Sequence, residues 1–338
     1  MFVVLRINLT IVFLTLVLIA PCQTFDFFTE EAYLRNPNHI EFGIGASNFL
    51  GDLGGKDDVG TNDFRDLEFT QFNPAMFVGF RHAFHKNFYG RANFNYGRVS
   101  GDDRLTKESY RNNRNLSFRS DIFELDLMGE LFIRIGAKKG HQYKLERSEV
   151  KSSPWHVRGS YFTVFGGVGL FHFNPKVQFQ DKWIMLQPLT TEGQGLPNGS
   201  NPYNLWQINI PVGFSYMVRL HRNWSFGIEA TYRYTFTDYI DDVSTTYYNA
   251  NDIALYQGAQ NGDVAAYLSN PSLGAANGGK PNIVTAPGQQ RGDEKDNDGY
   301  FYAIFKVDYL LINESKFTNK RTKRRGGTHF HKKTRMTI

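Results

Sequence analysis

Long runs in which apolar and polar residues alternate restrict the fold of this chain more than any other feature. In residues 206–220 the even positions, from Trp206 to Leu220, are apolar, and the odd positions are mainly polar or small. The run 224–236 repeats this pattern, and only three residues separate the two runs. A period of two predicts β-strands with one apolar face, and the short connection predicts a long antiparallel hairpin.

Six further runs bring the number of candidate strands to eight. They cover residues 40–47, 76–81, 88–96, 123–135, 158–173 and 300–311. The run 158–173 is apolar on both faces, so its orientation stays open. The longer runs exceed the roughly 5 to 6 residues of soluble sandwich strands and reach the roughly 9 to 11 that a tilted transmembrane strand needs. We therefore predict an all-β fold, an eight-stranded antiparallel up-and-down β-barrel that spans a membrane.

The connections between the runs are long at one end and mostly short at the other, which is typical of such barrels. The predicted extracellular loops are 51–73, 102–118, 174–204 and 241–298. The predicted periplasmic turns are 84–87, 137–157 and 221–223, of which 137–157 is an exception to the short pattern. Loop 241–298 is expected to be irregular, with a short helix near 253–269, and not to form a separate domain.

The N-terminus carries the parts of a secretory signal. Arg6 precedes an apolar stretch over 9–20, which is too short to cross a bilayer as a helix, and Ala20-Pro21-Cys22 offers a cleavage site. We predict a cleavable signal peptide over 1–24, with lipidation of Cys22 as the alternative. A mean hydropathy of −0.43 argues against a helical membrane protein. The expected location is the outer membrane of a Gram-negative bacterium, with its lipid as a partner.

The polar faces of the strands predict a charged barrel interior. Six acids and six bases fall on inward positions, and we call them the lumen charge network: Glu41, Arg81, Arg91, Glu124, Asp126, Glu130, Arg134, Arg219, Glu229, Arg233, Lys306 and Asp308. An eight-stranded barrel has room only for side chains, and buried charges must be paired. We interpret the set as a self-neutralising plug; a catalytic carboxylate pair is the alternative.

Other motifs give no support for a cofactor or a metal. In residues 293–299, acids at alternate positions precede a glycine, as in a calcium-binding loop. An EF-hand needs Glu at the twelfth position of its loop, where this chain has Phe305. A loose surface calcium site is the alternative. The nine histidines are scattered, and Gly43-Ile44-Gly45 lies inside a strand, which argues against a dinucleotide site. Several acids flank the strands and are expected to end them or to face solvent: Asp52, Asp102, Asp103, Asp241 and Asp242. We predict no enzymatic activity, no cofactor and no small-molecule substrate.

The C-terminal segment is strongly basic. After Glu314 the chain has no acid and nine Lys or Arg residues. We predict that 25–312 form the barrel and that 313–338 form a periplasmic tail that binds a partner through Lys320, Arg321, Lys323, Arg324 and Arg325. Because nucleic acid is absent from the periplasm, the expected partner is a protein or lipid phosphate. A disordered solubilising tail is the alternative.

Several short stretches together resemble a family of outer-membrane barrels of Bacteroidetes. They are 45–55 (GASNFLGDLGG), 97–103 (GRVSGDD), 114–118 with Glu124-Leu125, 165–175 (FGGVGLFHFNP), 238–248 (DYIDDVSTTYY) and Arg291-Gly292. The family includes the PorG-like proteins of the type IX secretion system. The resemblance implies a barrel associated with the periplasmic part of that machine, and it implies no catalytic residues.

These observations predict a non-enzymatic barrel that is a structural or assembly component and anchors periplasmic partners, and the resemblance implies a link to type IX protein secretion. A small transport barrel is the second hypothesis, although twelve inward charges leave little open lumen. An outer-membrane enzyme is the third, and it would need catalytic side chains that converge in the outer loops.

Overall fold

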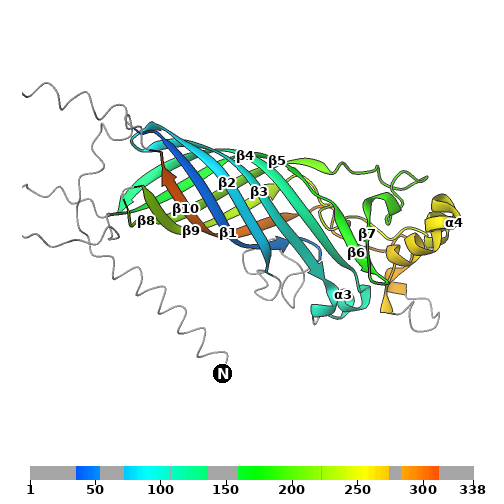
Figure 1. The fold of residues 1–338 in the computed structure, drawn as a ribbon. Helices are drawn as coiled ribbons and strands as arrows, with labels where there is room; N and C mark the ends of the chain where they lie inside the picture. The colour runs from blue at the N-terminus through cyan, green and yellow to red at the C-terminus, as the bar shows by residue number, and fades with distance from the viewer. Residues whose placement is uncertain are drawn as a thin grey trace, which may run out of the picture.

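Eight long strands form one antiparallel barrel in the computed structural model, which describes residues 36–53, 72–106, 108–135, 159–221, 223–273 and 283–311. The strands are β1 (Asn38–Leu50), β2 (Asn73–His85), β3 (Phe88–Asp102), β4 (Ser117–Ile135), β5 (Gly159–His172), β8 (Trp206–Arg219), β9 (Trp224–Thr235) and β10 (Gly299–Leu310). Each strand pairs with its neighbour in sequence, and β1 pairs with β10 over its length. The sheet therefore closes on itself, as Figure 1 shows, and the predicted fold class is confirmed.

The hydrophobic pattern of the barrel is reversed relative to that of a soluble protein. Ile44, in the middle of β1, exposes 71% of its surface on the outer face, while Glu41, three residues earlier on the same strand, is fully buried inside. Large apolar side chains are exposed on the outer face of every barrel strand, among them Phe42, Met76, Phe80, Phe94, Leu125, Leu127, Val168, Leu170, Ile208, Phe214, Ile228 and Phe305. A continuous apolar surface of this kind is stable against lipid, so the barrel spans a membrane.

The orientation of β5, which the sequence left open, is set by its partners. Tyr161, Thr163, Phe165 and Phe171 are buried inside the barrel, whereas Val164 and Leu170 are exposed outside. The glycines of β5 permit close approach to the neighbouring strands. A Cβ atom on Gly167 would lie 2.1 Å from the carbonyl oxygen of Leu127 on β4.

The two ends of the barrel differ in the length of their connections. At one end, β1 begins and β10 ends, and short connections join β2 to β3 and β8 to β9; in outer-membrane barrels the end with the short turns faces the periplasm. At the extracellular end, the connections carry η2 (Asp103–Leu105), α3 (Ser109–Arg114), β6 (Pro175–Phe179), β7 (Lys182–Met185), η3 (Gln187–Leu189), α4 (Ala250–Ser269) and η4 (Ile283–Thr285). Figure 1 shows these elements gathered beyond the far end of the strands.

The helix expected in the longest loop is present as α4. Asn249 caps it by accepting a hydrogen bond from the N–H of Asn251 at 3.0 Å. Gly258 has φ 71° and breaks the helical path, a conformation that a residue with a side chain rarely adopts. In the part of the chain that the structure describes, no helix is long and apolar enough to cross a membrane.

The hairpin of β6 and β7 was missed in the sequence. Only Phe173 and Asn174 separate β5 from β6, and β6 pairs with β4 at Arg119 and Ser120, so the sheet continues beyond the end of β5. The hairpin turns at Gln180 and Asp181, which both have positive φ, 46° and 63°. The predicted signal peptide (1–24), the turn 137–157 and the basic tail (313–338) lie outside the described residues.

Replacement of Ile44 by Arg tests whether the outer face contacts lipid. On the surface of a soluble protein this change would have little effect, whereas at the centre of a membrane-spanning strand it is expected to cost about 2–4 kcal/mol of unfolding free energy. Urea unfolding of the protein in lipid vesicles measures the difference. Leu255→Arg is the matched control, because Leu255 is 81% exposed on α4 outside the barrel. Equal stability of the two variants would contradict a transmembrane barrel.

Candidate functional site

A compact cluster of charged side chains fills the middle of the barrel around Lys306. The Nζ atom of Lys306 is 3.0 Å from the carboxylates of both Glu41 and Glu229. Arg91 contacts the same two carboxylates at 3.4 and 2.7 Å, and it lies 3.2 Å from Glu130. All five residues are buried. Each charge therefore has at least one opposite charge within contact distance, which is the condition under which ions can be buried.

A second group of charges lies next to this cluster, toward the periplasmic end. Arg81 is 3.1 Å from Glu41 and 3.2 Å from Asp308. Asp308 is also 2.9 Å from Nδ1 of His39. Beyond it, five buried residues pack into an apolar layer: Ala83, Tyr89, Phe132, Tyr161 and Met217. The periplasmic end of the lumen is thus closed by side chains.

A third group lies toward the extracellular end and is built around Arg233. Its guanidinium is 3.1 Å from Glu124 and 3.6 Å from Asp126. The Tyr300 hydroxyl donates a hydrogen bond to Glu124 at 2.7 Å, and the Asn95 amide donates one to Asp126 at 2.7 Å. The two carboxylates therefore share one cation, Arg233, and the neutral hydroxyl and amide groups donate further hydrogen bonds to them.

The structure places eleven of the twelve residues of the lumen charge network inside the barrel, each of them buried. Ten of them come together in the three groups just described. Arg219, at the end of β8, lies close enough to the second group for its charge to act on Asp308 and His39. The side chain of Arg134 lies outside the described residues. His39 is a member that the sequence reasoning missed. It stands two positions before Glu41 on the same face of β1, so the alternation that identified Glu41 could also have identified it.

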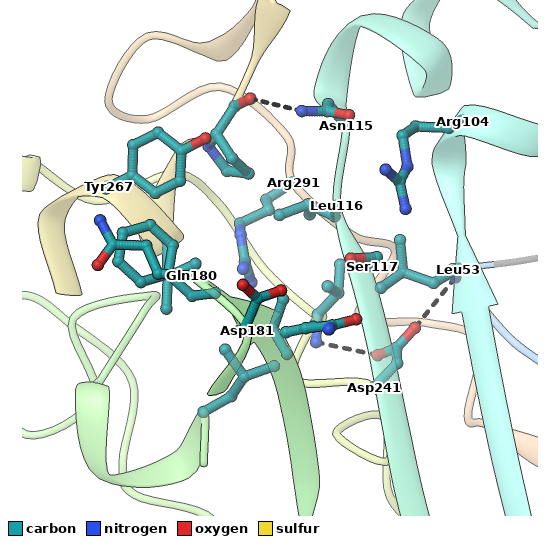
Figure 2. A pocket seen from close by; sticks show the side chains of 17 residues that line it. Leu53, Arg104, Asn115, Leu116, Ser117, Gln180, Asp181, Asp241, Tyr267 and Arg291 are labelled. Atoms are coloured by element: carbon teal, nitrogen blue, oxygen red, sulfur yellow. Dashed lines mark hydrogen bonds between the residues drawn. The ribbon is translucent and has the colours of Figure 1, made fainter. Parts of the chain in front are cut away.

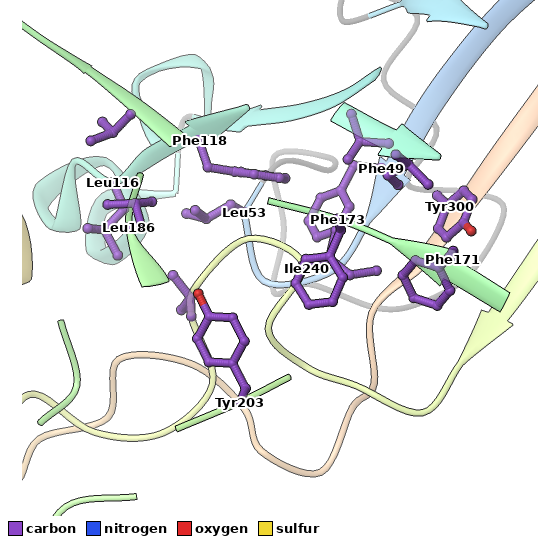
Figure 3. Packing of buried hydrophobic residues seen from close by; sticks show 14 of the residues in the cluster. Phe49, Leu53, Leu116, Phe118, Phe171, Phe173, Leu186, Tyr203, Ile240 and Tyr300 are labelled. Atoms are coloured by element: carbon purple, nitrogen blue, oxygen red, sulfur yellow. The ribbon is translucent and has the colours of Figure 1, made fainter. Parts of the chain in front are cut away.

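The extracellular connections form an assembly with an apolar core of its own. Phe171 and Phe173 at the end of β5 pack against Tyr300 of β10 and against Tyr203 from the β7–β8 connection, as Figure 3 shows. Ile240 from the β9–β10 connection is fully buried in the same cluster. The core joins the extracellular connections to the upper part of the lumen, so the loops cover the barrel mouth.

Arg114 at the end of α3 holds three connections together. It forms an ion pair with Asp103 at 2.7 Å. Its other guanidinium nitrogens donate hydrogen bonds to the carbonyl oxygens of Asp52 at 2.8 Å and Arg291 at 2.6 Å. Burial alone would lower the pKa of Arg114, but the adjacent carboxylate of Asp103 raises it beyond its usual value. The guanidinium is therefore a permanent charge at a joint between the first, second and fourth loops.

Glu192 and Arg291 form a second joint, which connects the third and fourth loops. They are paired at 2.8 Å, and both are buried. The carboxylate of Glu192 accepts hydrogen bonds from the backbone N–H groups of Ser244 and Thr245 at 2.9 and 3.1 Å. Asp242 lies beside them and accepts hydrogen bonds from the hydroxyls of Thr191 (2.6 Å) and Tyr203 (2.7 Å).

Four carboxyl groups gather at the barrel mouth, and we call them the mouth carboxyls: Asp52, Asp238, Asp241 and Asp298. Three of them bind backbone N–H groups of the loops; Asp241, for example, accepts hydrogen bonds from Leu53 at 3.0 Å and Val243 at 2.9 Å. Burial raises the pKa of Asp52 to about 6 and that of Asp238 to about 10. Burial also raises the pKa of Asp241 and of Asp298, and repulsion among the mouth carboxyls adds to both shifts.

The expectation that the acids flanking the strands end them or face solvent is partly wrong. Asp102 does end β3, and it pairs with Arg104 at 2.6 Å. Asp103, Asp241 and Asp242 are instead buried. Asp103 binds the N–H of Leu116 in its own loop, whereas Asp241 and Asp242 bind donors of neighbouring loops. A period-two pattern cannot reveal such contacts, since they depend on how the loops meet in space.

The alternative of a calcium loop at 293–299 gains no support. Asp298 is buried and accepts a hydrogen bond from the N–H of Ile240 at 2.8 Å, so it points away from a surface site. Among the described residues, no group of three or more His, Cys, Asp or Glu side chains is arranged to hold a metal ion.

A pocket of about 600 Å³ opens on the extracellular side of this assembly (Figure 2). The β6–β7 hairpin forms one wall with Phe179, Gln180 and Asp181, and α4 contributes Tyr267. The segment between α3 and β4 forms the opposite wall, where the Asn115 side chain donates a hydrogen bond to the carbonyl oxygen of Pro271 at 3.0 Å.

Comparisons with known proteins give little beyond these observations. No family model matches the chain, and no curated protein matches it. Among solved structures, Ail, the attachment invasion locus protein of Yersinia pestis, aligns with 82% of this chain and 99% of its own, at 8% identity and a TM-score of 0.33. Neisserial surface protein A aligns with 81% of this chain and 97% of its own, at 8% identity and a TM-score of 0.33. The N-terminal β-barrel domain of Pseudomonas aeruginosa OprF aligns with 82% of this chain and 99% of its own, at 6% identity and a TM-score of 0.30. The barrel assignment rests on the closed strand pairing and the apolar outer face.

Removal of one charge from the central cluster should destabilise the barrel strongly. Glu41→Ala leaves Arg81, Arg91 and Lys306 with a missing partner in a buried site, and the expected loss is about 3–5 kcal/mol of unfolding free energy. Urea unfolding followed by tryptophan fluorescence measures it. Glu294→Ala, which changes an exposed acid in a loop, is the control. A Glu41→Ala midpoint equal to that of the control would show that the cluster does not stabilise the barrel.

The mouth carboxyls should make the extracellular loops less stable as the pH rises. Their pKa values in the folded state lie above the ordinary value, at about 6 for Asp52 and about 10 for Asp238. The stability that the protonated groups give is therefore fully present below about pH 4 and is lost as the pH rises through these values. Hydrogen exchange of peptides that cover 238–246, corrected for the intrinsic rate, should therefore be faster at pH 8 than at pH 5. Asp238→Asn should reduce this dependence, and Asp296→Asn, at an exposed site, should leave it unchanged. An unaltered dependence in Asp238→Asn would contradict the assignment.

Proposed function

We propose that this chain is a non-conducting outer-membrane barrel that acts as a structural or assembly anchor and is linked to type IX protein secretion. The observation that carries the proposal is the filled lumen. Paired charges occupy its middle, an apolar layer closes its periplasmic end, and the loop core covers its extracellular end. Since the interior of an eight-stranded barrel is only just wide enough for side chains, such a filling favours a rigid support over a channel.

The periplasmic direction of the proposed anchor comes from the sequence. The last strand, β10, runs toward the periplasmic end, and the basic segment 313–338 follows it. A segment with nine Lys or Arg residues and one acid attracts acidic protein surfaces or lipid phosphates. The resemblance of segments such as 45–55 and 165–175 to PorG-like barrels supports the link to type IX secretion.

An enzymatic role finds less support. The loop acids that could act as catalytic groups already bind donors of the protein. Asp103 is paired with Arg114, Asp241 holds two backbone N–H groups, and Asp242 holds two hydroxyls. Their arrangement is that of residues that fix the loop conformation.

Deletion of 313–338 should leave the barrel folded and abolish recovery of its periplasmic partners. The experiment is crosslinking in native membranes, affinity purification and mass spectrometry. A variant with Lys320, Arg321, Lys323, Arg324 and Arg325 all changed to Gln should lose the same partners, because their positive charge is the proposed attraction. A variant with Lys332, Lys333 and Arg335 changed to Gln serves as the matched control. Recovery of the same partners without the tail would refute the anchor role of the tail.

Planar-bilayer recording distinguishes the anchor from a transport barrel. The wild-type protein should give no steady conductance, because charged side chains fill the lumen. A triple variant, Glu41→Ala, Arg91→Ala and Lys306→Ala, removes the centre of the filling and tests whether a plug is present. Steady open channels from the wild-type protein would favour the transport hypothesis.

A further inference from the structure

We propose that the extracellular pocket between the β6–β7 hairpin, α4 and the α3–β4 segment binds a neutral saccharide. This inference is independent of the proposed anchor function, which concerns the periplasmic side. The volume of about 600 Å³ lies within the range of ligand pockets, roughly 300–1,000 Å³. The lining combines aromatic rings with several polar side chains of both donor and acceptor character.

One wall of the pocket presents aromatic rings. The rings of Phe179 and Tyr267 contact each other with centroids 5.4 Å apart and an interplanar angle of 49°. Tyr267 is 49% exposed although it stands on a helix that is packed against the loop assembly. An exposed aromatic ring held by a second ring offers a flat apolar surface. The C–H faces of a pyranose ring match such a surface.

The hairpin turn places polar groups beside these rings. Gln178, Gln180 and Asp181 line the pocket, and their side chains form no hydrogen bond within the described residues. Gln180 and Asp181 adopt the positive φ values for which a tight hairpin turn usually uses Asn and Gly. Unfavourable backbone conformations of this kind concentrate at binding sites. Amide and carboxylate groups together can donate to and accept from the hydroxyl groups of a sugar.

The arginines around the pocket are already paired, which argues against an anionic ligand, and the exposed carboxylate of Asp181 can accept hydrogen bonds from sugar hydroxyls. Arg104 is already paired with Asp102 at 2.6 Å, and Arg291 is paired with Glu192 at 2.8 Å. Figure 2 shows Arg104, Asp241 and Arg291 among the side chains that line the pocket. Asp241 is engaged with backbone N–H groups at 2.9 and 3.0 Å. A phosphate ligand would need an uncompensated positive charge, and a lipid chain would need a lining that is apolar throughout.

Titration of the full-length protein in detergent micelles tests the proposal. Maltotriose, chitotriose and mannotriose are the probes, and saturation-transfer NMR with calorimetry is the readout. At least one trisaccharide should bind. Tyr267→Ala and Gln180→Gly should each weaken that binding at least tenfold. Gln180→Gly removes the side chain and suits the positive φ of the turn, so it preserves the fold.

Tyr256→Ala is the matched control, because Tyr256 is an exposed tyrosine of α4 that does not line the pocket. It should bind as the wild type does, and Tyr267→Phe, which keeps the ring, should retain most of the binding. The proposal is overturned if no trisaccharide binds at millimolar concentration, if Tyr267→Ala and Gln180→Gly bind as the control does, or if inorganic phosphate or a tripeptide binds in preference. Loss of the periplasmic partners has no bearing on this result, so the two proposals fail separately.

Discussion

The pairing of buried charges inside the barrel is the interaction on which the rest of the structure depends. Lipid outside requires an apolar outer face, and the period of two in each strand then directs the polar residues inward. Eight strands leave a lumen without room for bulk water, so these residues must satisfy one another. Lys306, Arg91 and the carboxylates of Glu41 and Glu229 do so in the middle of the barrel.

The extracellular assembly follows a different rule. Its loops have an apolar core centred on residues such as Phe173 and Ile240, as a small soluble domain has. Its polar contacts, however, connect one loop to another: the guanidinium of Arg114 donates hydrogen bonds to the carbonyl oxygens of Asp52 and Arg291. The molecule thus combines a membrane part with a polar interior and an extracellular part with an apolar interior. The two meet at Tyr300, which packs against Phe171 and donates a hydrogen bond to Glu124.

The fold could be predicted from the sequence because alternation is a local signal. The eight runs became eight strands, and the inward positions of residues such as Glu124 and Lys306 followed from the period alone. The candidate pocket could not be predicted, because its walls come from β6, β7, α4 and the segment after α3, which approach one another only in space. The burial of Asp241 and Asp242 was missed for the same reason. The hairpin turn at Gln180-Asp181 lacks the Asn-Gly signal by which such turns are recognised.

The joints between the loops have a consequence for how this surface can change during evolution. The extracellular loops of a barrel can usually accept insertions and substitutions independently, since each is tied only to its own pair of strands. Here Arg114 holds the backbone of two other loops, and Glu192 holds the backbone at Ser244 and Thr245. A length change in one loop would displace partners in the others. The four loops are therefore expected to vary together between related proteins, as parts of one inherited unit.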